Sequence, residues 1–489
     1  MWRCRSTRLL WGKTLEPPTN LLVRRLFLTA LGLIYLIAFA SFGLPVTGLI
    51  GADGILPASD FLQAVQGHFG SRGFWLAPTV FWLNASDAFL QLACIAGAAL
   101  AVLLILGFAQ RAVSILLFVA YLSLVSAGQV FMSFQWDALL LETGFLAIFL
   151  GSPSTLVIWL FRWLLFRLTF LSGAVKLLSG DAAWRSLTAL DFHFETQPLP
   201  NVIAWVMHQL PGWFHTLSVA LMFFVELAVP FLIFAPRRVR FFGAASIVLF
   251  QTLIFLTGNY TFFNLLTVAL CLFLLDDAAL RRIVPRWIIE RISRAPAGRN
   301  DTARGRAGVA VLAAAIVSIS GFQWLETFSG RLPQPIGEVL SWLAPLRTVN
   351  TYGLFAIMTT SRPEIVVEGS NDGRAWLEYE FKYKPGDVRR PPLWVAPHQP
   401  RLDWQMWFAA LGSYNTNPWF ANFMVRLLQG SPAVLALLEK NPFPDAPPRY
   451  IRAALYDYRF TDWATRSAEG TWWWRAREGL YFPVVSLGD

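Results

Sequence analysis

Cysteine is almost missing from this chain of 489 residues, which holds only Cys4, Cys94 and Cys271. Their spacing fits no metal site and no disulfide framework, so neither is expected to stabilise the fold. We expect three ordinary buried or interfacial thiols. The P-loop, the dinucleotide fingerprint and a Ser/His/Asp signature are missing as well. The sequence therefore predicts no metal and no cofactor.

Charge is also scarce. Charged residues make up 14% of the chain and hydrophobic residues 56%, whereas soluble domains carry about 25% and 45–50%. This imbalance predicts membrane lipid as a partner. The net charge of +10 would suit nucleic acid, but the arginines border apolar runs, where they usually set membrane topology. No nucleic-acid partner is expected.

Long apolar runs are what the chain does have. A span needs about 20 apolar residues to cross about 30 Å of hydrocarbon. Nine runs qualify or nearly qualify, and the fourth and eighth are short: 24–44, 88–108, 112–132, 135–151, 156–178, 214–235, 239–257, 260–275 and 308–325. The sequence thus predicts a cytoplasmic segment 1–23, a polytopic α-helical bundle of about nine spans over 24–325, and a C-terminal domain over 326–489.

Arginines give the bundle its predicted orientation. They are dense before residue 26, at 237–240 and between 281 and 306, and positive charge in short loops favours the cytoplasm. The first apolar run is long enough to span and lacks an Ala-x-Ala exit, so we expect no cleaved signal peptide. Nine is an odd number. The region after Glu326 is therefore predicted to lie outside the cytoplasm.

This C-terminal region has the pattern of a small α+β, β-sandwich-like domain. Residues 364–370 and 376–383 alternate polar and apolar, and Ser-Asn-Asp-Gly joins them, which predicts a β-hairpin. Helices are expected at 404–411, 418–429 and 431–440. Strands are expected at 456–460 and 472–475, where aromatic residues are dense.

Two acids in the bundle are the first candidate functional residues. Asp137 and Glu142 lie about 140° apart around a helix of 3.6 residues per turn, so they do not face one another. One reading is structural, in which one acid pairs with Arg162, Arg167 or Lys176 while the other lies near the interface. The other reading is a substrate or proton role, because intramembrane charges are costly.

Lys176 lies near the predicted external end of its span, behind Gly173. Its ammonium either extends outward to water or acts as a base with a lowered proton affinity. Gly173 allows another backbone or a ligand to come close. Glu226, a lone acid in the sixth span, is expected to pair inside the bundle. The histidines of the preceding external loop fit no metal motif, and we expect them to pack among aromatics: His193, His208 and His215.

Tryptophan is dense in the C-terminal region. An exposed aromatic face would indicate a protein-binding surface. The residues predicted to bind a client protein there are Trp376, Trp404, Trp407, Trp472, Trp473 and Trp474.

Four longer segments of the chain have a recognisable pattern: Thr351-Tyr-Gly-Leu-Phe-Ala-Ile-Met-Thr-Thr-Ser-Arg-Pro-Glu-Ile, Glu368-Gly-Ser-Asn-Asp-Gly, Val395-Ala-Pro-His-Gln-Pro-Arg-Leu-Asp-Trp and, in the bundle, Phe134-Gln-Trp-Asp-Ala-Leu-Leu-Leu-Glu-Thr-Gly-Phe. Through these segments the chain resembles the lipase maturation factor family over most of its length. The resemblance implies a multi-pass membrane chaperone that assists protein folding of lipases, in eukaryotes within the endoplasmic reticulum.

A second resemblance concerns the bundle alone. Phe170-Leu-Ser-Gly-Ala-Val-Lys-Leu is similar to the segment of vitamin K-dependent gamma-carboxylases that holds their catalytic lysine, and Lys176 falls at that lysine. Those enzymes also use a histidine in a Trp-Asn-Asn-His run. The equivalent here, Trp136-Asp137-Ala138-Leu139, has none, which counts against carboxylase chemistry.

Two hypotheses therefore stand side by side. The first is a non-enzymatic folding factor for secreted lipases or other exported proteins, in a bacterial inner membrane with a periplasmic C-terminal domain or in the endoplasmic reticulum membrane. The second is an intramembrane, gamma-carboxylase-like enzyme with Lys176 as base and Asp137 or Glu142 as its partner. The oligomeric state has no signature in the sequence.

Overall fold

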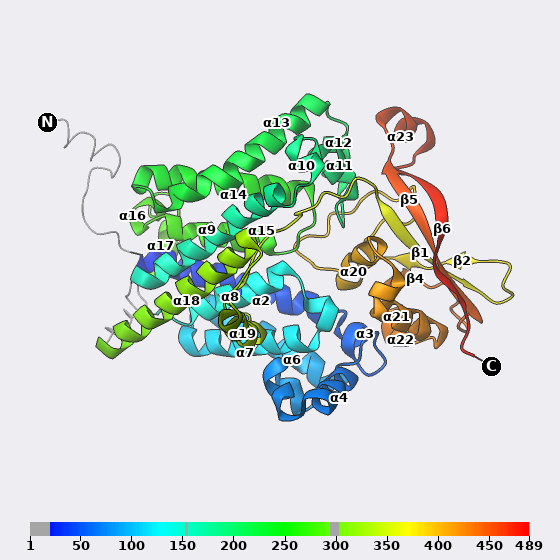
Figure 1. Cartoon of the computed structure of the whole chain (residues 1–489), viewed down its shortest axis with the longest axis horizontal. Coiled ribbons are helices and arrows are strands. Elements are labelled where there is room, and N and C mark those ends of the chain that lie inside the picture. The colour runs from blue at the N-terminus through cyan, green and yellow to red at the C-terminus, as the bar shows by residue number, and fades with distance from the viewer. Residues whose placement is uncertain (1–19, 152–154, 294–302, 489) are drawn as a thin grey trace.

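The computed structural model describes residues 20–151, 155–293 and 303–488. Two parts of the predicted cytoplasmic side lie outside the described residues. They are residues 1–19, which include Cys4, and residues 294–302, which include two of the arginines. Within the described residues the chain forms a helical bundle followed by an α+β region built on antiparallel sheets, as the sequence predicts (Figure 1).

Seven helices in the described residues are long and apolar enough to cross a membrane. They are α2 (Leu21–Gly43), α6 (Asp87–Leu106), α7 (Gln110–Ala127), α9 (Thr155–Leu178), α13 (Gly212–Phe223) with its continuation to Phe234, α14 (Arg237–Thr257) and α18 (Ala303–Ser329). The two runs that the sequence marks as short form α8 (Gln135–Ala147) and α15 (Phe263–Cys271), which ends in a 3-10 turn, Leu272–Leu274. All nine predicted runs are thus helical.

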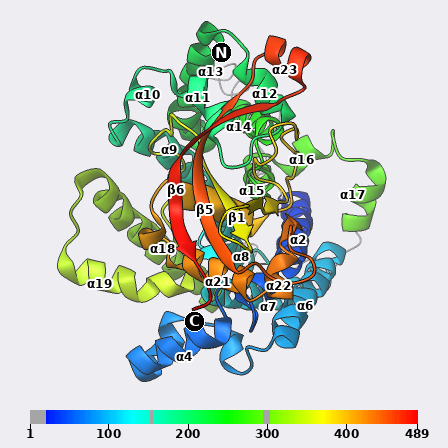
Figure 2. The same ribbon diagram turned by 90° about the vertical axis from the view of Figure 1, so that its right-hand side faces the viewer.

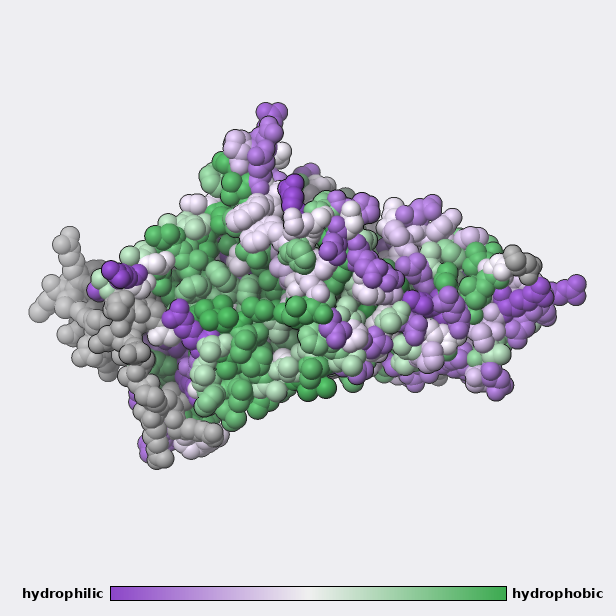
Figure 3. Space-filling view, turned by 90° about the horizontal axis from the view of Figure 1, so that it is seen from below, coloured by the Kyte–Doolittle hydropathy of each residue, from purple (hydrophilic) through white to green (hydrophobic). Residues whose placement is uncertain are grey.

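The surface of the bundle matches a lipid environment. Leucines and isoleucines on α6 and α14 lie more than half exposed, among them Ile95 and Leu249. Figure 3 shows apolar residues gathered in a band over the bundle and polar residues gathered over the α+β end. Such a band is expected where helices face hydrocarbon rather than water.

Short helices fill the loops between the spans. The first long loop holds α3 (Val46–Ile50), α4 (Ala58–Phe69) and α5 (Gly73–Leu76), and the second holds α10 (Ala182–Arg185), α11 (Ala189–Thr196) and α12 (Val202–His208). At the opposite end of the bundle lie α16 (Asp277–Leu280) and α17 (Arg286–Ser293) (Figure 1). There Asp277 accepts hydrogen bonds from the backbone amides of Leu21 and Val23, at 2.9 and 3.1 Å, which satisfies free amides at the start of α2.

The C-terminal region contains a four-stranded antiparallel sheet in the order β2-β1-β5-β6. Its strands are β1 (Pro363–Ser370), β2 (Leu377–Glu378), β5 (Tyr450–Phe460) and β6 (Trp473–Val485). The predicted hairpin is confirmed, since Glu368 pairs with Glu378 across β1 and β2. A second sheet pairs β3 (Glu380–Phe381) with β4 (Leu438–Lys440).

Helices pack between this sheet and the bundle. Helix α20 (Arg401–Ala410) contacts β1, and α21 (Pro418–Leu428) contacts β5. The helix predicted at 431–440 is wrong for its second half, because α22 stops after Pro432–Leu435 and residues 438–440 pair with β3. The other elements of this half are α19 (Gln334–Leu343) and α23 (Trp463–Glu469).

One continuous apolar core joins the two halves. Phe27 and Leu164 of the bundle belong to the same buried cluster as Ile365 and Phe420 of the C-terminal region. Figure 2 looks onto the sheet end and shows β1, β5 and β6 standing in front of the bundle. The sheet therefore caps one end of the bundle and is not tethered to it by a loose linker.

Candidate functional site

Asp137 forms a buried ion pair with the C-terminal region. Its Oδ2 and Oδ1 lie 2.6 and 2.8 Å from the guanidinium nitrogens of Arg401, the first residue of α20. Tyr121 donates a third hydrogen bond to Asp137 at 2.5 Å, and Arg401 also donates to the backbone carbonyl of Phe131 at 2.8 Å. Asp137 and Arg401 are at most 1% exposed. Asp137 is therefore paired with the C-terminal region, and not with Arg162, Arg167 or Lys176 of the neighbouring helix.

Glu142 pairs inside the bundle with Arg167, one of the partners that the sequence suggests. Its second oxygen accepts from the backbone amide of Asn350 at 2.9 Å and from the hydroxyl of Tyr352 at 2.8 Å. Arg167 in turn donates to the carbonyl of Asn350 at 3.0 Å. The segment that leads into the C-terminal domain is thus fixed to the bundle by charged groups.

Lys176 is buried with Glu226, so it does not extend outward to water. Its Nζ lies 2.8 and 3.0 Å from the two carboxylate oxygens and donates to the carbonyl of Ser172 at 3.0 Å. Its three protons are therefore all engaged. At Gly173 it is side chains that come close, because a Cβ there would lie 2.8 Å from the Cβ of Glu226.

A local irregularity presents Glu226 to this lysine. Residues 224–228 form a π-helical turn and residues 229–234 a 3-10 turn. Pro230 has no N–H for the carbonyl four residues earlier, which is that of Glu226, and its ring clashes with a regular helix. Such widened turns are frequent at functional sites. The spacing of Glu226 and Pro230 is the signal in the sequence that could have identified this turn.

The three candidate catalytic residues do not form one site. Asp137 bonds to Arg401, Glu142 to Arg167, and Lys176 to Glu226. Neither of the two acids contacts the lysine. Lys176 therefore lacks the partner that the enzyme hypothesis assigns to it, because neither Asp137 nor Glu142 bonds to it.

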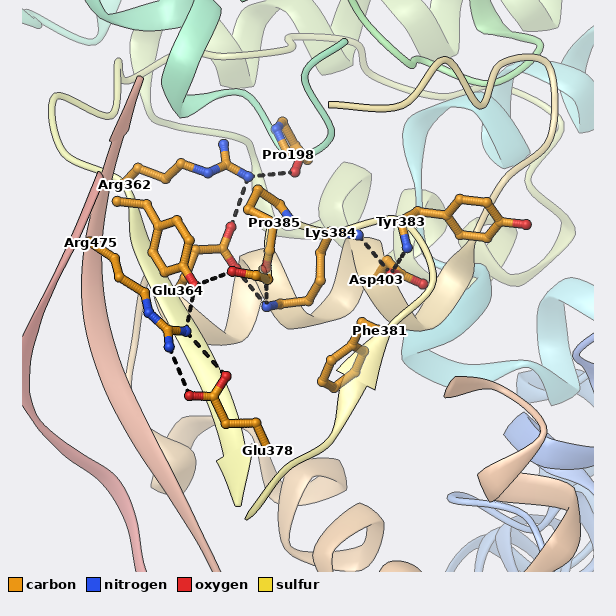
Figure 4. Close-up of polar contacts among 12 residues, drawn as sticks. Pro198, Arg362, Glu364, Glu378, Phe381, Tyr383, Lys384, Pro385, Asp403 and Arg475 are labelled. Atoms are coloured by element: carbon orange, nitrogen blue, oxygen red, sulfur yellow. Dashed lines mark hydrogen bonds and ion pairs between the residues drawn. The ribbon is translucent and has the colours of Figure 1, made fainter. Parts of the chain in front are cut away.

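The start of strand β1 is attached to the bundle through Arg362. Its guanidinium donates to the backbone carbonyls of Glu195 and Pro198, at 2.6 and 2.9 Å, and lies 2.8 Å from the carboxylate of Glu364. The second oxygen of Glu364 lies 2.9 Å from Lys384 (Figure 4). Burial lowers the pKa of Arg362, while the charge of Glu364 opposes this effect. This cluster holds the sheet against the loop between α11 and α12.

An apolar cavity of about 580 Å³ lies beside Lys176 and Glu226. Its walls come from every helix from α9 to α15 and from Leu354 and Phe355. Most of the wall is hydrophobic. Among its polar members are the Lys176–Glu226 pair, His193, Tyr260 and the hydrogen-bonded Gln251 and Asn264. A cavity of this size and lining is typical of a small-molecule site.

The loop histidines pack among aromatics and ion partners, as expected. His193 lies edge-on to Phe355, and His215 bonds to Asp191 at 2.8 Å. No group of three or more possible ligands for a metal occurs within the described residues. Burial, aided by the charge of Lys176, lowers the pKa of His193 to about 4, so this imidazole is neutral near pH 7.

The six tryptophans predicted to bind a client have different surroundings. Trp404, Trp407 and Trp473 are at most 6% exposed and belong to the core of this chain. Trp404 contacts Trp136, and Trp407 donates to the carbonyl of Thr196 at 2.8 Å. These contacts leave three of the six on the surface: Trp376 and Trp472, which are half-buried, and Trp474, which is 53% exposed.

Together these features define a multi-pass membrane protein whose extramembrane α+β domain is fixed to the bundle by buried charges. Family models agree. The lipase maturation factor transmembrane domain matches residues 22–282, and the lipase maturation factor C-terminal domain matches residues 348–483. The chain belongs to the lipase maturation factor family.

Curated relatives match along nearly the whole chain. Lipase maturation factor 1 of Bos taurus is 39% identical, over 97% of this chain and 91% of its own length. Lipase maturation factor 2 of Gallus gallus is 37% identical over 97% and 82%, and that of Homo sapiens is 37% identical over 96% and 83%. No solved structure gives a significant match.

Proposed function

We propose that this chain is a membrane-anchored folding factor that assists the maturation of secreted lipases or similar exported proteins. Its membership of the lipase maturation factor family supports this role, since both regions match the family in sequence. Binding a non-native client would lower its free concentration and suppress aggregation, without any covalent chemistry.

The exposed edge of the sheet is the observation that carries the proposal. Strand β6 is the last strand of its sheet, and no strand in the described residues pairs with its outer edge. Three apolar side chains of β6 are about half exposed: Trp474, Leu480 and Val484. Apolar groups on a free strand edge suit extended, apolar segments that a client exposes before it folds.

The same edge also carries features that prevent permanent pairing. Arg477 and Glu478 are exposed, and Pro483 has no backbone N–H to donate to another strand. The register between β5 and β6 also shifts along the strand. Charges, proline and bulges on an edge strand oppose lasting association between chains. We infer that clients bind β6 transiently, through side-chain contacts around Trp474 and Leu480.

The attachment of the sheet sets where a client would bind. Buried charges hold α20, the segment at Asn350 and the start of β1 on the bundle. The β6 edge would therefore stay at a fixed distance from the bilayer. The start of α2 and the sheet lie at opposite ends of the molecule (Figure 1), which supports an extracytoplasmic sheet. The membrane would be that of the endoplasmic reticulum, or the bacterial inner membrane with a periplasmic sheet.

The test replaces the three exposed apolar residues of β6 with serine, Trp474→Ser, Leu480→Ser and Val484→Ser. We expect normal membrane insertion but less active lipase secreted per lipase made. The matched control keeps an apolar surface, with Trp474→Phe, Leu480→Ile and Val484→Ile, and should retain activity. Full lipase maturation by the serine variant would contradict the proposal.

A further inference from the structure

Helix α19 follows directly after a membrane span, so the chain itself holds this helix at the bilayer surface. Span α18 ends at Ser329, and α19 begins at Gln334. The segment between them, residues 330–333, reaches at most about 14 Å when it is fully extended. This is less than half of the hydrocarbon thickness of about 30 Å. Helix α19 therefore lies in or beside the leaflet at which α18 ends.

Helix α5 is held at a span end by a different part of the chain. A 3-10 turn, Val80–Trp82, follows α5, and only residues 83–86 separate this turn from span α6. The loop that holds α5 also touches the C-terminal region, since Ser431 donates to the carbonyl of Asp53 at 2.7 Å. Helix α5 therefore lies at the end of the bundle that the sheet caps.

Two stacked tryptophans join α5 to α19. The ring centroids of Trp75 on α5 and Trp342 on α19 lie 4.4 Å apart, with an angle of 17° between the planes. The indole N–H of Trp75 also donates to the carbonyl of Trp342 at 2.8 Å. Figure 2 shows α19 and α4, the helix before α5, projecting to the same side of the bundle. Residues 58–83 and 330–343 thus form one structure, the lateral platform.

The lateral platform has apolar side chains that no other part of the described chain covers. Helix α19 has no buried residue, and its Val339 and Trp342 are more than half exposed. In the first segment, Phe74 is half exposed and Leu83 is 86% exposed. Val339 and Trp342 are three positions apart and share one face of α19, whereas Ser341 lies about 160° around the axis from Val339. The helix therefore has an apolar face and a polar face.

Electrostatic attraction does not account for this surface. The charged residues of the lateral platform are two acids, Asp60 and Glu338, and two arginines, Arg72 and Arg331, so their formal charges cancel. A helix with tryptophan and aliphatic residues on one face and polar residues on the other is typical of the membrane interface. Such helices enter the boundary between headgroups and acyl chains by about 5–10 Å. The position, the exposed side chains and the charge balance all fit a lipid surface.

We propose that the lateral platform inserts into the leaflet on the sheet side of the membrane, with Val339, Trp342 and Leu83 among the acyl chains. Its partner is the lipid surface as a whole, and burial of apolar side chains stabilises the contact. Headgroup charge has no part in it, because the platform has no net charge. The insertion concerns the bilayer and not the client, so this proposal and client binding at β6 can fail independently.

The experiment measures how deeply single labelled positions lie in the membrane. The full-length protein carries Cys4→Ser, and the two cysteines in the described residues are buried. Val339→Cys, Leu83→Cys and Ser341→Cys are each labelled with the fluorophore NBD and placed in phosphatidylcholine nanodiscs. Ser341→Cys is the matched control, because it lies on the opposite face of the same helix. All three native side chains are exposed, so the variants should fold.

Two quenchers report the position of each label. A lipid with a spin label high on its acyl chain should quench the labels at Val339 and Leu83 at least about twofold more strongly than the label at Ser341. Aqueous iodide should give the opposite order. Adding phosphatidylglycerol should not change either order. Equal iodide quenching at all three positions would place the platform in water, and protection of Val339 from both quenchers would show that protein covers it. Either result would overturn the proposal.

Discussion

Replacing Arg401 by methionine is the sharpest test of how the two halves are held together. The change removes the guanidinium but keeps a side chain of comparable length. Asp137 then remains 0% exposed without its cation, and breaking one side of a buried ion pair costs about 3–5 kcal/mol. Arg401→Met should therefore lower the free energy of unfolding by about that amount.

The double variant separates the ion pair from simple loss of packing. With Asp137→Leu added to Arg401→Met, no buried charge is left, and apolar replacement of a buried pair is often close to neutral. The carbonyl of Phe131 and the hydroxyl of Tyr121 still lose partners, which costs about 1–3 kcal/mol. We expect the double variant to be more stable than Arg401→Met alone.

The assay is equilibrium unfolding of the purified protein in detergent, with survival of the monodisperse peak after heating as a second readout. Arg459→Met is the control, because Arg459 is 66% exposed and bonds to Asp457 at the surface, where such a pair contributes about 0–1 kcal/mol. The reasoning is refuted if Arg401→Met is as stable as Arg459→Met. It is also refuted if the stability lost by the double variant equals the sum of the losses of Arg401→Met and Asp137→Leu measured alone, since coupled sites are not additive.

Three other features predict measurable behaviour. Gly173→Ala should lower the unfolding midpoint, because the new Cβ would meet Glu226 at 2.8 Å, whereas Gly321→Ala, where nothing lies within 4 Å, should not. The pKa of His193 is about 4, below its ordinary 6.5. As the pH falls from 6.5 to 4, the unfolded chain binds this proton before the folded chain does, so the free energy of unfolding should fall over that range. His193→Phe should flatten this part of the stability profile. A reporter fused after Asp489 should be active outside the cytoplasm, and a cytoplasmic signal would contradict the orientation.

Local patterns in the sequence predict the fold well where the structure is itself local. Apolar runs predict all nine helices of the bundle, and the alternation around Asn371-Asp372-Gly373 predicts the hairpin. The apolar runs do not predict helices α10 and α12, but their capping residues are present in the sequence: Asp181 accepts from the amide of Trp184, and Asn201 from that of Ala204. Capping residues before short apolar runs are the signal that identifies them.

The partners of the buried charges could not be predicted in the same way. Asp137 and Arg401 are separated by 264 positions, and no periodicity links them. Burial of Trp404 and Trp407 depends on the same long-range contact, because α20 lies between the sheet and the bundle. An aromatic cluster in a sequence fits a core and a binding face equally well, and only tertiary packing distinguishes the two.

The buried charges explain why the membrane half and the C-terminal half belong together as one structure. A bundle ending at Leu325 would retain Asp137 without Arg401, and Glu142 without Asn350 and Tyr352. Unpaired buried charge and orphaned acceptors destabilise a fold by several kcal/mol each, which is comparable to the whole stability of a domain. Truncation would therefore damage the bundle as well as remove the sheet. Substitutions on the exposed edge of β6, which leave every buried pair intact, are the perturbation that isolates client binding from folding.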